Sequence, residues 1–486
     1  MNAVSSVSSA DSAVKLRAAY ERAGQGQVFQ FWTQLSSTQQ ASLCAQAAKI
    51  DLAEISQLVE AHLHGGVKPT VDFSRLRPAP ALALPENGGD SVQWTRAKAR
   101  GEDALRRGAV ACFTVAGGQG TRLGFDGPKG AFPVTPVRGH SLFQVFAEKI
   151  RAAGLRYGKT PPWLILTSPA NHAATKDFFA AHNYFGLDPA RVFFFPQGTM
   201  PAVGFDGKIM LEAPDRIALS PDGHGGSLRA LARGGAIEIL RDLGVQTLSY
   251  FQVDNPLVRC VDPEFIGFHL ETKSEMSTKM IPKRGPAEKI GHLCLDPQDR
   301  VVVVEYSDMP PALCAEREPG GELRFRAGSI GIHALDREFI ARIGSGHDPA
   351  CRLPFHRANK KISTVDANGQ PLQPTEPNGV KFEMFVFDAL PFARQATIIE
   401  TSRVDDFSPV KNSTGEDSVE SCRDDQLRQF ARWLQSAGAT IPVDATGRPS
   451  FNIEISPLFG DDPASISDRW HSLASKPKIA DGLFLT

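Results

Sequence analysis

The sequence lacks three features that would each have placed it in a different class of protein. No two of its seven cysteines form a C-x-x-C pair, and their number is odd. Scattered thiols disfavour a disulfide framework or a zinc site and fit a reducing compartment, so we expect a cytoplasmic protein. No run approaches the roughly 18 apolar residues that a membrane span needs. No basic segment followed by an apolar core, as in a secretory signal, is present at the start.

The chain also has little net charge. Its 53 basic and 54 acidic residues give a formal charge of −1, so no general attraction to nucleic acid or to an anionic membrane is expected. Any chemistry on phosphates must therefore depend on lysine and arginine side chains at particular positions. The length of 486 residues, with 42% hydrophobic and 22% charged, is that of a globular protein with a large central domain and appendages.

The apolar pattern along the chain predicts an α/β protein. Residues 1–105 show helical spacing, interrupted by a Pro-rich connector at 75–89. From residue 106, strand-like and helix-like segments alternate, which is typical of a mostly parallel central sheet with helices on both faces. Short β-rich runs at 276–332 predict an antiparallel insertion or extension of the sheet. We expect an N-terminal helical region at 1–105, a central domain at 106–400 and a smaller C-terminal domain at 401–486.

The most specific motif is the Gly-rich segment VAGGQGTRLGFDGPKGAFPV at 115–134. It directly follows a predicted buried strand at 109–115, so its glycines let backbone N–H groups approach phosphate oxygens. Cations within the same segment would face a triphosphate bound there. The expected nucleotide-binding residues are Gly117, Gly118, Gly120 and Thr121, and the expected phosphate-binding cations are Arg122 and Lys129.

Two other phosphate-binding loops fit this segment less well. A dinucleotide-binding loop needs G-x-G-x-x-G and an acidic residue at the end of the second strand. Here the spacing is G-x-G-x-x-x-G, and the second predicted strand, at 162–168, ends without an acid. A P-loop needs G-K-[S/T], whereas this chain has Gly130 after Lys129. A nicotinamide-dependent dehydrogenase is therefore disfavoured, and a plain Gly-rich turn with two surface cations stays open as the structural alternative.

Other polar residues lie at predicted strand ends or among glycines. Gln197 follows a strand-like run, and its amide offers both a donor and an acceptor for a uracil edge. Gly223 and His224 lie in PDGHGG, where a nucleobase or ribose could come close to the backbone. Asp254 closes a hydrophobic strand, and a carboxylate beside a triphosphate implies a bridging Mg²⁺. A solvated loop or turn residue remains the alternative for each of them.

These motifs resemble those of the eukaryotic-type UDP-sugar pyrophosphorylases, and most closely the UDP-N-acetylhexosamine pyrophosphorylases. The similarity continues in order over about residues 110–420. It includes FPQGTMPAV at 195–203, QVDNPLVRCVDPEFIGF at 252–268, EPNGVKFEMFVFD at 376–388 and DDFSPVKNSTGEDS at 405–418. The resemblance implies a central domain of the nucleotide-sugar transferase type (GT-A, Rossmann-like), with UTP and a sugar 1-phosphate as substrates and Mg²⁺ as the cofactor.

The resemblance also implies roles for individual residues. Glu305, Asn378 and Gly291 would contact the sugar, and Asp254 would hold the metal. Lys411 would hold the phosphate of the sugar 1-phosphate, whose approach to another anion needs a positioned cation. This phosphate would attack the α-phosphorus of UTP in line and release pyrophosphate. No enzyme nucleophile is needed, so catalysis would consist of positioning and charge neutralisation.

The chain departs from the N-acetylhexosamine branch at two places. His224 stands where that branch usually has Asn, and His there is similar to the UDP-glucose and broad UDP-sugar enzymes. The sugar-pocket strand, usually G-N-I-x-N-H, reads GSIGIH at 328–333, so Ser329 and Ile332 replace two amides. A UTP–glucose-1-phosphate or broad UDP-sugar pyrophosphorylase therefore stays open, as does a non-catalytic UDP-sugar-binding sensor. We expect a monomer or weak homo-oligomer without nucleic-acid or membrane partners.

Overall fold

The computed structural model describes residues 9–65 and 72–486, and the chain folds into two compact units. The first comprises Met1–Asp72, Gly198–Gly226 and Leu353–Val386, and the second comprises Phe73–Gln197, Ser227–Arg352 and Phe387–Thr486. The boundaries predicted at 105 and 400 do not coincide with those of the units, because segments far apart in sequence pair with one another. The expected absence of a secretory signal concerns the first residues of the chain, of which 1–8 lie outside the described residues.

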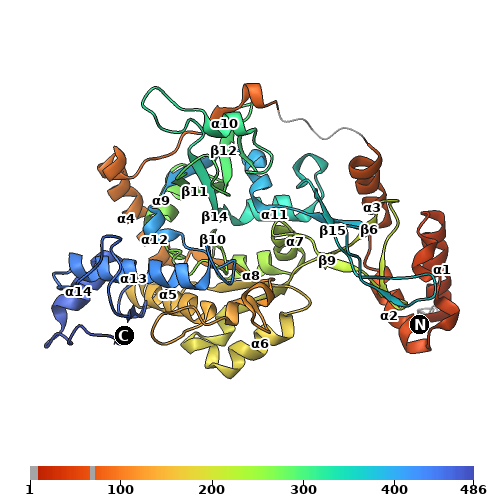
Figure 1. Ribbon diagram of the computed structural model, residues 1–486, viewed down its shortest axis with the longest axis horizontal. Helices are drawn as coiled ribbons and strands as arrows, with labels where there is room; N and C mark the ends of the chain where they lie inside the picture. The colour runs from red at the N-terminus through yellow and green to blue at the C-terminus, as the bar shows by residue number, and fades with distance from the viewer. Residues whose placement is uncertain (1–8, 66–71) are drawn as a thin grey trace. The chain divides into compact units, whose positions relative to one another are not determined.

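The second unit is built on a ten-stranded mixed sheet (Figure 1). Its parallel strands neighbour one another in the order β10 (Thr247–Gln252), β2 (Val110–Val115), β3 (Trp163–Thr167) and β4 (Val192–Pro196). The sheet continues from β10 into antiparallel pairing through β14 (Ala327–Asp336), β12 (Gly291–Leu295), β13 (Val301–Val304) and β1 (Arg77–Pro78). Strand β11 (Met276–Pro282) pairs with β14, and β19 (Ala396–Glu400) pairs with β11. The α/β class and the antiparallel extension are thereby confirmed.

The helices of the second unit connect and cover these strands. They are α4 (Ser91–Arg107), α5 (Leu142–Tyr157), α6 (His172–Ala181), α7 (Gly226–Arg233), α8 (Ala236–Asp242), α9 (Pro263–Glu271), α10 (Pro311–Ala315), α11 (Arg337–Ser345), α12 (Arg403–Asp406), α13 (Val419–Ser436) and α14 (Pro463–Ser472). Helices α7 and α8 are separate because Gly235 takes a left-handed φ of 79° between them. In the described ranges, the helices are too short or too polar to cross a bilayer.

Helix α5 illustrates why the sequence forms the core of this unit. The hydroxyl of Ser141 accepts the N–H of Gln144 and caps its first turn, and Gly158 ends it in a left-handed conformation. Phe143, Phe146 and Ile150 recur at helical spacing and are fully buried with residues of β2 and β3. Burial of each such side chain contributes about 1.5–3 kcal/mol.

The last part of the second unit has a hydrophobic cluster of its own. It contains α13, α14, β20 (Ile453–Ile455) and β21 (Leu483–Leu485), around Trp433 and Trp470. Figure 1 shows α13 and α14 beside α5, and Arg156 of α5 pairs with Asp462 at the start of α14 at 2.6 Å. The C-terminal segment thus packs on the central sheet domain within one unit.

The first unit combines short helices with small antiparallel sheets. Its elements are α1 (Ser9–Arg22), α2 (Ser37–Ala47), α3 (Leu52–Val59), β5 (Thr199–Pro201), β6 (Val203–Gly204), β7 (Leu211–Ala213), β8 (Arg216–Ile217), β9 (Leu219–Pro221), β15 (His356–Lys360), β16 (Thr364–Val365), β17 (Pro371–Leu372) and β18 (Gly379–Glu383). Strand β18 lies between β15 and β6, which joins the Leu353–Val386 segment to the Gly198–Gly226 segment. The N-terminal helices are held there by contacts such as Gln46 accepting the N–H of Ile217 at 3.0 Å.

Candidate active site

The Gly-rich loop follows β2 at the carboxyl edge of the parallel strands. The N–H of Gly120 donates to the carbonyl of Gly127 at 2.9 Å, and the N–H of Lys129 donates to the carbonyl of Gly118 at 3.1 Å. The loop is therefore closed by its own hydrogen bonds, and the N–H of Gly120 donates within the loop. A Cβ on Gly120 would come within 2.7 Å of the Phe125 ring, so this position requires glycine for packing as well.

A buried asparagine that the sequence analysis missed supports this loop. The amide of Asn171, just before α6, donates to the carbonyls of Ala116 and Gly118 at 3.0 and 3.2 Å. Its Oδ1 accepts the N–H of Ser168 at 2.8 Å. The available sequence signal was an Asn at the start of a predicted helix, which normally indicates only a cap. Asn171 instead connects the loop after β3 to the loop after β2.

Gln197 and Gly117 lie next to each other, although 80 positions separate them in sequence. Gln197 follows β4, and its N–H donates to the carbonyl of Thr167 at 2.7 Å. A Cβ on Gly117 would come within 3.0 Å of the Oε1 of Gln197. The structure thus brings together two residues that were predicted to bind the nucleotide, one as a phosphate-loop glycine and the other as a uracil reader.

Lys129 and Asp254 form an ion pair at the same edge of the sheet. The Nζ of Lys129 lies 3.1 Å from the Oδ2 of Asp254, and their side chains are 16% and 14% exposed. Asp254 follows β10, so the carboxylate stands beside the loop that follows the neighbouring β2. A pair so placed can exchange partners when an anion and a cation bind together, because each charge then meets a new opposite charge.

Lys411 reaches the same region from a loop near the C-terminus. The N–H of Val410 donates to the carbonyl of Asp254 at 2.8 Å, which fixes the backbone next to Lys411 against the metal-binding candidate. The Nζ of Lys411 lies 3.4 Å from the Oδ2 of Asp417, and the lysine side chain is 43% exposed. The ammonium is thus accessible to an anion from solvent.

Thr121 and Arg122 lie in a short 3-10 helix, Thr121–Leu123, within the Gly-rich loop. Both residues are exposed. An anion arriving from solvent can reach both side chains, and the roles predicted for them remain predictions.

Three residues associated with the sugar come together in the antiparallel half of the sheet. Gly291 opens β12 and pairs with Ser329 of β14. A Cβ on Gly291 would lie 3.7 Å from the Oε1 of Glu305. Ile332, in contrast, is only 2% exposed and belongs to the hydrophobic core. Two positions carry other residues where the family has amides. Of these, Ser329 lies beside Gly291, whereas Ile332 lies in the hydrophobic core.

Gln252 is a further polar residue of this edge that the sequence analysis did not single out. It ends β10, two residues before Asp254, and pairs with Val115 at the start of the Gly-rich segment. Its Nε2 would lie 3.2 Å from a Cβ on Gly331, which has a left-handed φ of 69°. The only sequence signal was its position at a strand end.

Gly223 and His224 lie in the first unit. Gly223 has a φ of 84°, and a Cβ there would come within 2.3 Å of the carbonyl oxygen of Met384. This glycine therefore allows close contact with the backbone of the same chain. That contact explains why glycine is needed here, and no ligand has to be invoked. Its nucleotide role stays a prediction.

The ring of His224 is held in one orientation. Its Nδ1 accepts the N–H of Val386 at 3.1 Å, and it stacks on Phe385 with ring centroids 5.2 Å apart. Burial, and secondarily the nearby His356, lowers the pKa of His224 to about 4. The imidazole is therefore neutral near pH 7, with its proton on Nε2.

Asn378, also in the first unit, uses its amide within the chain. Its Oδ1 accepts the N–H of Ile362 at 2.8 Å, and its Nδ2 donates to the carbonyl of Ile362 at 3.0 Å. The side chain thus connects β18 to the segment after β15. Its predicted contact with the sugar stays a prediction.

A magnesium ion at this site would have one protein carboxylate. Within residues 9–65 and 72–486, no group of three or more His, Cys, Asp or Glu residues is arranged to hold a metal. Asp254 nevertheless fits Mg²⁺, because this ion commonly takes one or two carboxylates and completes its shell with substrate phosphates and water.

The fold and these contacts define the class of the protein. A glycine loop, Lys129 and Asp254 meet at the carboxyl edge of parallel strands, and the backbone next to Lys411 bonds to Asp254, as expected for an α/β enzyme that acts on nucleotide phosphates. A family model described as UTP–glucose-1-phosphate uridylyltransferase matches residues 51–421. The chain belongs to this family of uridylyltransferases, which confirms the resemblance and the enzyme class predicted from the sequence.

Relatives match the chain over nearly its whole length. A UDP-N-acetylhexosamine pyrophosphorylase-like protein 1 from Xenopus tropicalis is 37% identical, covering 94% of this chain and 91% of its own. A UDP-N-acetylglucosamine pyrophosphorylase from Saccharomyces cerevisiae is 35% identical, covering 86% and 90%. A crystal structure of the uridine diphosphate N-acetylglucosamine pyrophosphorylase from Trypanosoma brucei, in complex with an inhibitor, has a TM-score of 0.82 at 27% identity, covering 100% and 99%.

Proposed function

We propose that the chain transfers the uridylyl group of UTP to an N-acetylhexosamine 1-phosphate, with release of pyrophosphate. The observation that carries this proposal is the Lys129–Asp254 pair beside the Gly-rich loop, with Lys411 on the adjoining loop. The names of the relatives support the N-acetylated sugar. We also propose that the central sheet domain is of the nucleotide-sugar transferase type. A cytoplasmic location and a monomeric or weakly oligomeric state remain proposals.

The mechanism follows from the charges at this edge. Lys129 and Arg122 bind the β- and γ-phosphates of UTP and stabilise the charge on the leaving pyrophosphate. Lys411 holds the phosphate of the sugar 1-phosphate so that its oxygen faces the α-phosphorus in line. Asp254 would hold Mg²⁺, which would supply positive charge to offset that of the phosphates. No proton needs to leave the attacking phosphate, so no side chain acts as a general base.

The binding residues then orient the two substrates. Gly117, Gly118 and Thr121 bind phosphate oxygens, and Gln197 pairs with the uracil. Glu305 and Gly291 contact the sugar, since they lie together beside β14.

A second candidate is a pyrophosphorylase for glucose 1-phosphate or for several sugars. Ser329 favours it, because it lies against Gly291 and offers a hydroxyl where an amide is expected. A polar site discriminates through paired hydrogen bonds, so a missing amide weakens selection for the N-acetyl group.

The test is pyrophosphate release from UTP and Mg²⁺ with a panel of sugar 1-phosphates. We expect the highest kcat/KM with N-acetylglucosamine or N-acetylgalactosamine 1-phosphate. Equal or faster turnover of glucose 1-phosphate would favour the second candidate. Binding of UDP-sugar without exchange of labelled pyrophosphate would instead show a sensor, and the transferase proposal would be abandoned.

A further inference from the structure

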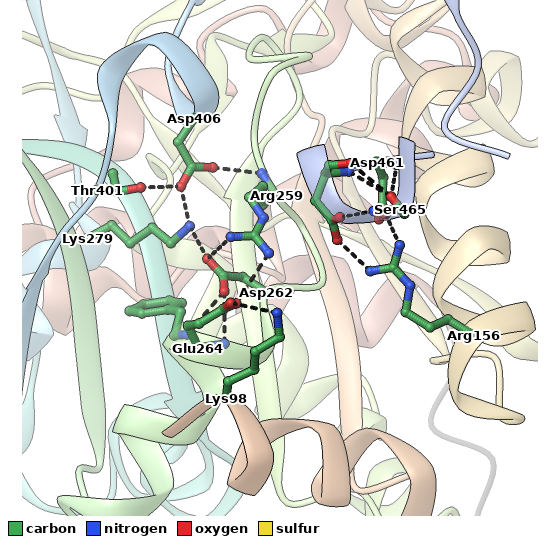
Figure 2. Close-up of polar contacts among 12 residues, drawn as sticks. Lys98, Arg156, Arg259, Asp262, Glu264, Lys279, Thr401, Asp406, Asp461 and Ser465 are labelled. Atoms are coloured by element: carbon green, nitrogen blue, oxygen red, sulfur yellow. Dashed lines mark hydrogen bonds and ion pairs between the residues drawn. The ribbon is translucent and has the colours of Figure 1, made fainter. Parts of the chain in front are cut away.

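A buried ion cluster in the second unit joins Lys279, Asp262 and Asp406 (Figure 2). Lys279 of β11 is 2% exposed, and its ammonium contacts the Oδ2 of Asp262 at 2.7 Å and the Oδ2 of Asp406. Burial lowers the pKa of Lys279, but its attraction to the two carboxylates is stronger, so the net pKa is raised. The lysine therefore stays charged inside the protein and holds both carboxylates.

Asp406 is completely buried, and both of its carboxylate oxygens have partners. Its Oδ1 accepts the backbone N–H of Arg259 at 2.7 Å, and its Oδ2 also accepts the hydroxyl of Thr401 at 2.7 Å. The guanidinium of Arg259 in turn forms an ion pair with Glu264, with Nη2 and Oε2 3.2 Å apart. The side chain of Asp406 is thus fixed from β11, from the segment after β10 and from its own segment.

The backbone around Asp406 is connected directly to the candidate active site. The amide of Asn255, the neighbour of Asp254, donates to the carbonyl of Asp406 at 2.7 Å. The Oδ1 of the same amide accepts the N–H of Ser408 at 3.0 Å. With the bond from Val410 to Asp254, three hydrogen bonds align residues 406–410 along the Asp254 turn.

Burying charged groups such as those of this cluster costs desolvation energy. Replacing a buried ion pair by apolar residues is often neutral or stabilising, so ion pairs of this kind are weak evidence for stability. A cluster with fixed directions is instead suited to define geometry. Lys411 follows the segment that Asp406 anchors, and the loop beyond it is exposed at Glu416. The anchor therefore determines where the base of the Lys411 side chain lies.

We propose that Asp406, held by Lys279, is a positioning residue that sets Lys411 against Asp254 for the phosphate of the sugar 1-phosphate. This inference rests on the proposed function, which gives Lys411 its substrate. Asp406 acts through Asn255 and the 406–410 backbone, without touching substrate.

The test is a double-mutant cycle with Asp406→Asn and Lys411→Ala, measured with UTP, Mg²⁺ and N-acetylglucosamine 1-phosphate. Asp406→Asn keeps the shape of the side chain but removes the charge that Lys279 binds. We expect kcat/KM for the sugar 1-phosphate to fall about tenfold or more, while UTP binding, followed by calorimetry, changes less than about threefold. In the Lys411→Ala background, the same substitution should lower kcat/KM less than about twofold further.

A matched control is available one residue away. Asp405 is also a carboxylate of α12, but it pairs with Arg432 of α13 and not with the buried cluster. Asp405→Asn should therefore leave the KM for the sugar 1-phosphate within about twofold of the original. A loss as large as that of Asp406→Asn would overturn the positioning role.

Other outcomes separate the inference from the proposed function. If Asp406→Asn lowers kcat/KM equally with and without Lys411, the inference is wrong although the enzyme assignment stands. If Lys411→Ala alone leaves turnover unchanged, the assignment of Lys411 itself is wrong.

A milder variant is available if Asp406→Asn does not fold. Thr401→Val removes only one hydrogen bond to the same carboxylate and should also raise the KM for the sugar 1-phosphate. Unchanged kinetics per folded molecule would overturn the proposal.

Discussion

The ammonium of Lys129 and the carboxylate of Asp254 lie 3.1 Å apart, although 125 positions separate them in sequence. Each side chain is mostly buried, so each relies on the other for charge compensation. Binding of UTP with a divalent cation would give the lysine a phosphate and the carboxylate a metal. The pair thus keeps both groups in place before substrate arrives, and it predicts that the two residues are coupled in the reaction.

Lys129→Ala should lower kcat/KM for UTP by about 10²–10³, equivalent to about 2.7–4 kcal/mol of transition-state stabilisation. The loss has two sources, the missing cation at the leaving pyrophosphate and an Asp254 without its partner. Steady-state pyrophosphate release measures it, with Lys176→Ala on the exposed side of α6 as the control. Near-normal turnover of Lys129→Ala would remove this residue from the mechanism.

Asp254→Asn should raise the concentration of Mg²⁺ needed for half-maximal rate at least tenfold (about 1.4 kcal/mol), because an amide oxygen is a weaker ligand than a carboxylate. The measurement is a Mg²⁺ titration at saturating UTP and sugar 1-phosphate. If the variant loses rate without any shift in the Mg²⁺ dependence, Asp254 does not hold the ion.

Ser329→Asn should raise the preference for N-acetylated over plain sugar 1-phosphates by roughly threefold to tenfold, because it adds an amide beside Gly291. The ratio of the two kcat/KM values is the readout. Ile332→Asn serves as the contrast, since that side chain is in the core. It should destabilise the protein by about 1–3 kcal/mol without changing the ratio. An unchanged ratio for Ser329→Asn would place the acetyl group elsewhere.

The stability of the protein should fall as the pH drops from about 6.5 to about 4. Burial lowers the pKa of His269 to about 4, and its Nδ1 lies 2.9 Å from the hydroxyl of Ser277. In this window the unfolded chain takes up the proton and the folded chain does not, so protons favour unfolding. The contribution of one such histidine is on the order of 3 kcal/mol, present above pH 6.5 and lost progressively as the pH falls to about 4.

Urea unfolding of the original protein and of His269→Gln at pH 7 and pH 4.5 measures this effect. The variant should lose less stability between the two values, because glutamine does not titrate. Equal losses in both proteins would show that His269 does not contribute to the pH dependence.

Local pattern in the sequence determined the order of elements and the nucleotide loop. Buried strands such as β2 and β3 are continuous apolar runs, and α5 has both helical spacing and a cap, so each is specified by neighbouring residues. The glycines at 117–120 and the Asp254 that follows β10 were likewise identified from their neighbours in sequence. Family motifs then supplied Lys411 and Glu305, which have no distinctive local signal.

Only the tertiary structure decided which of these residues meet. The pairing of Lys129 with Asp254, the support of the loop by Asn171 and the anchoring of Asp406 by Lys279 all join segments that are distant in sequence. The division into two units likewise depends on β18 pairing with β6 across more than a hundred residues. Such contacts depend on sheet order and burial, which long-range packing sets and which a window of neighbouring residues does not contain.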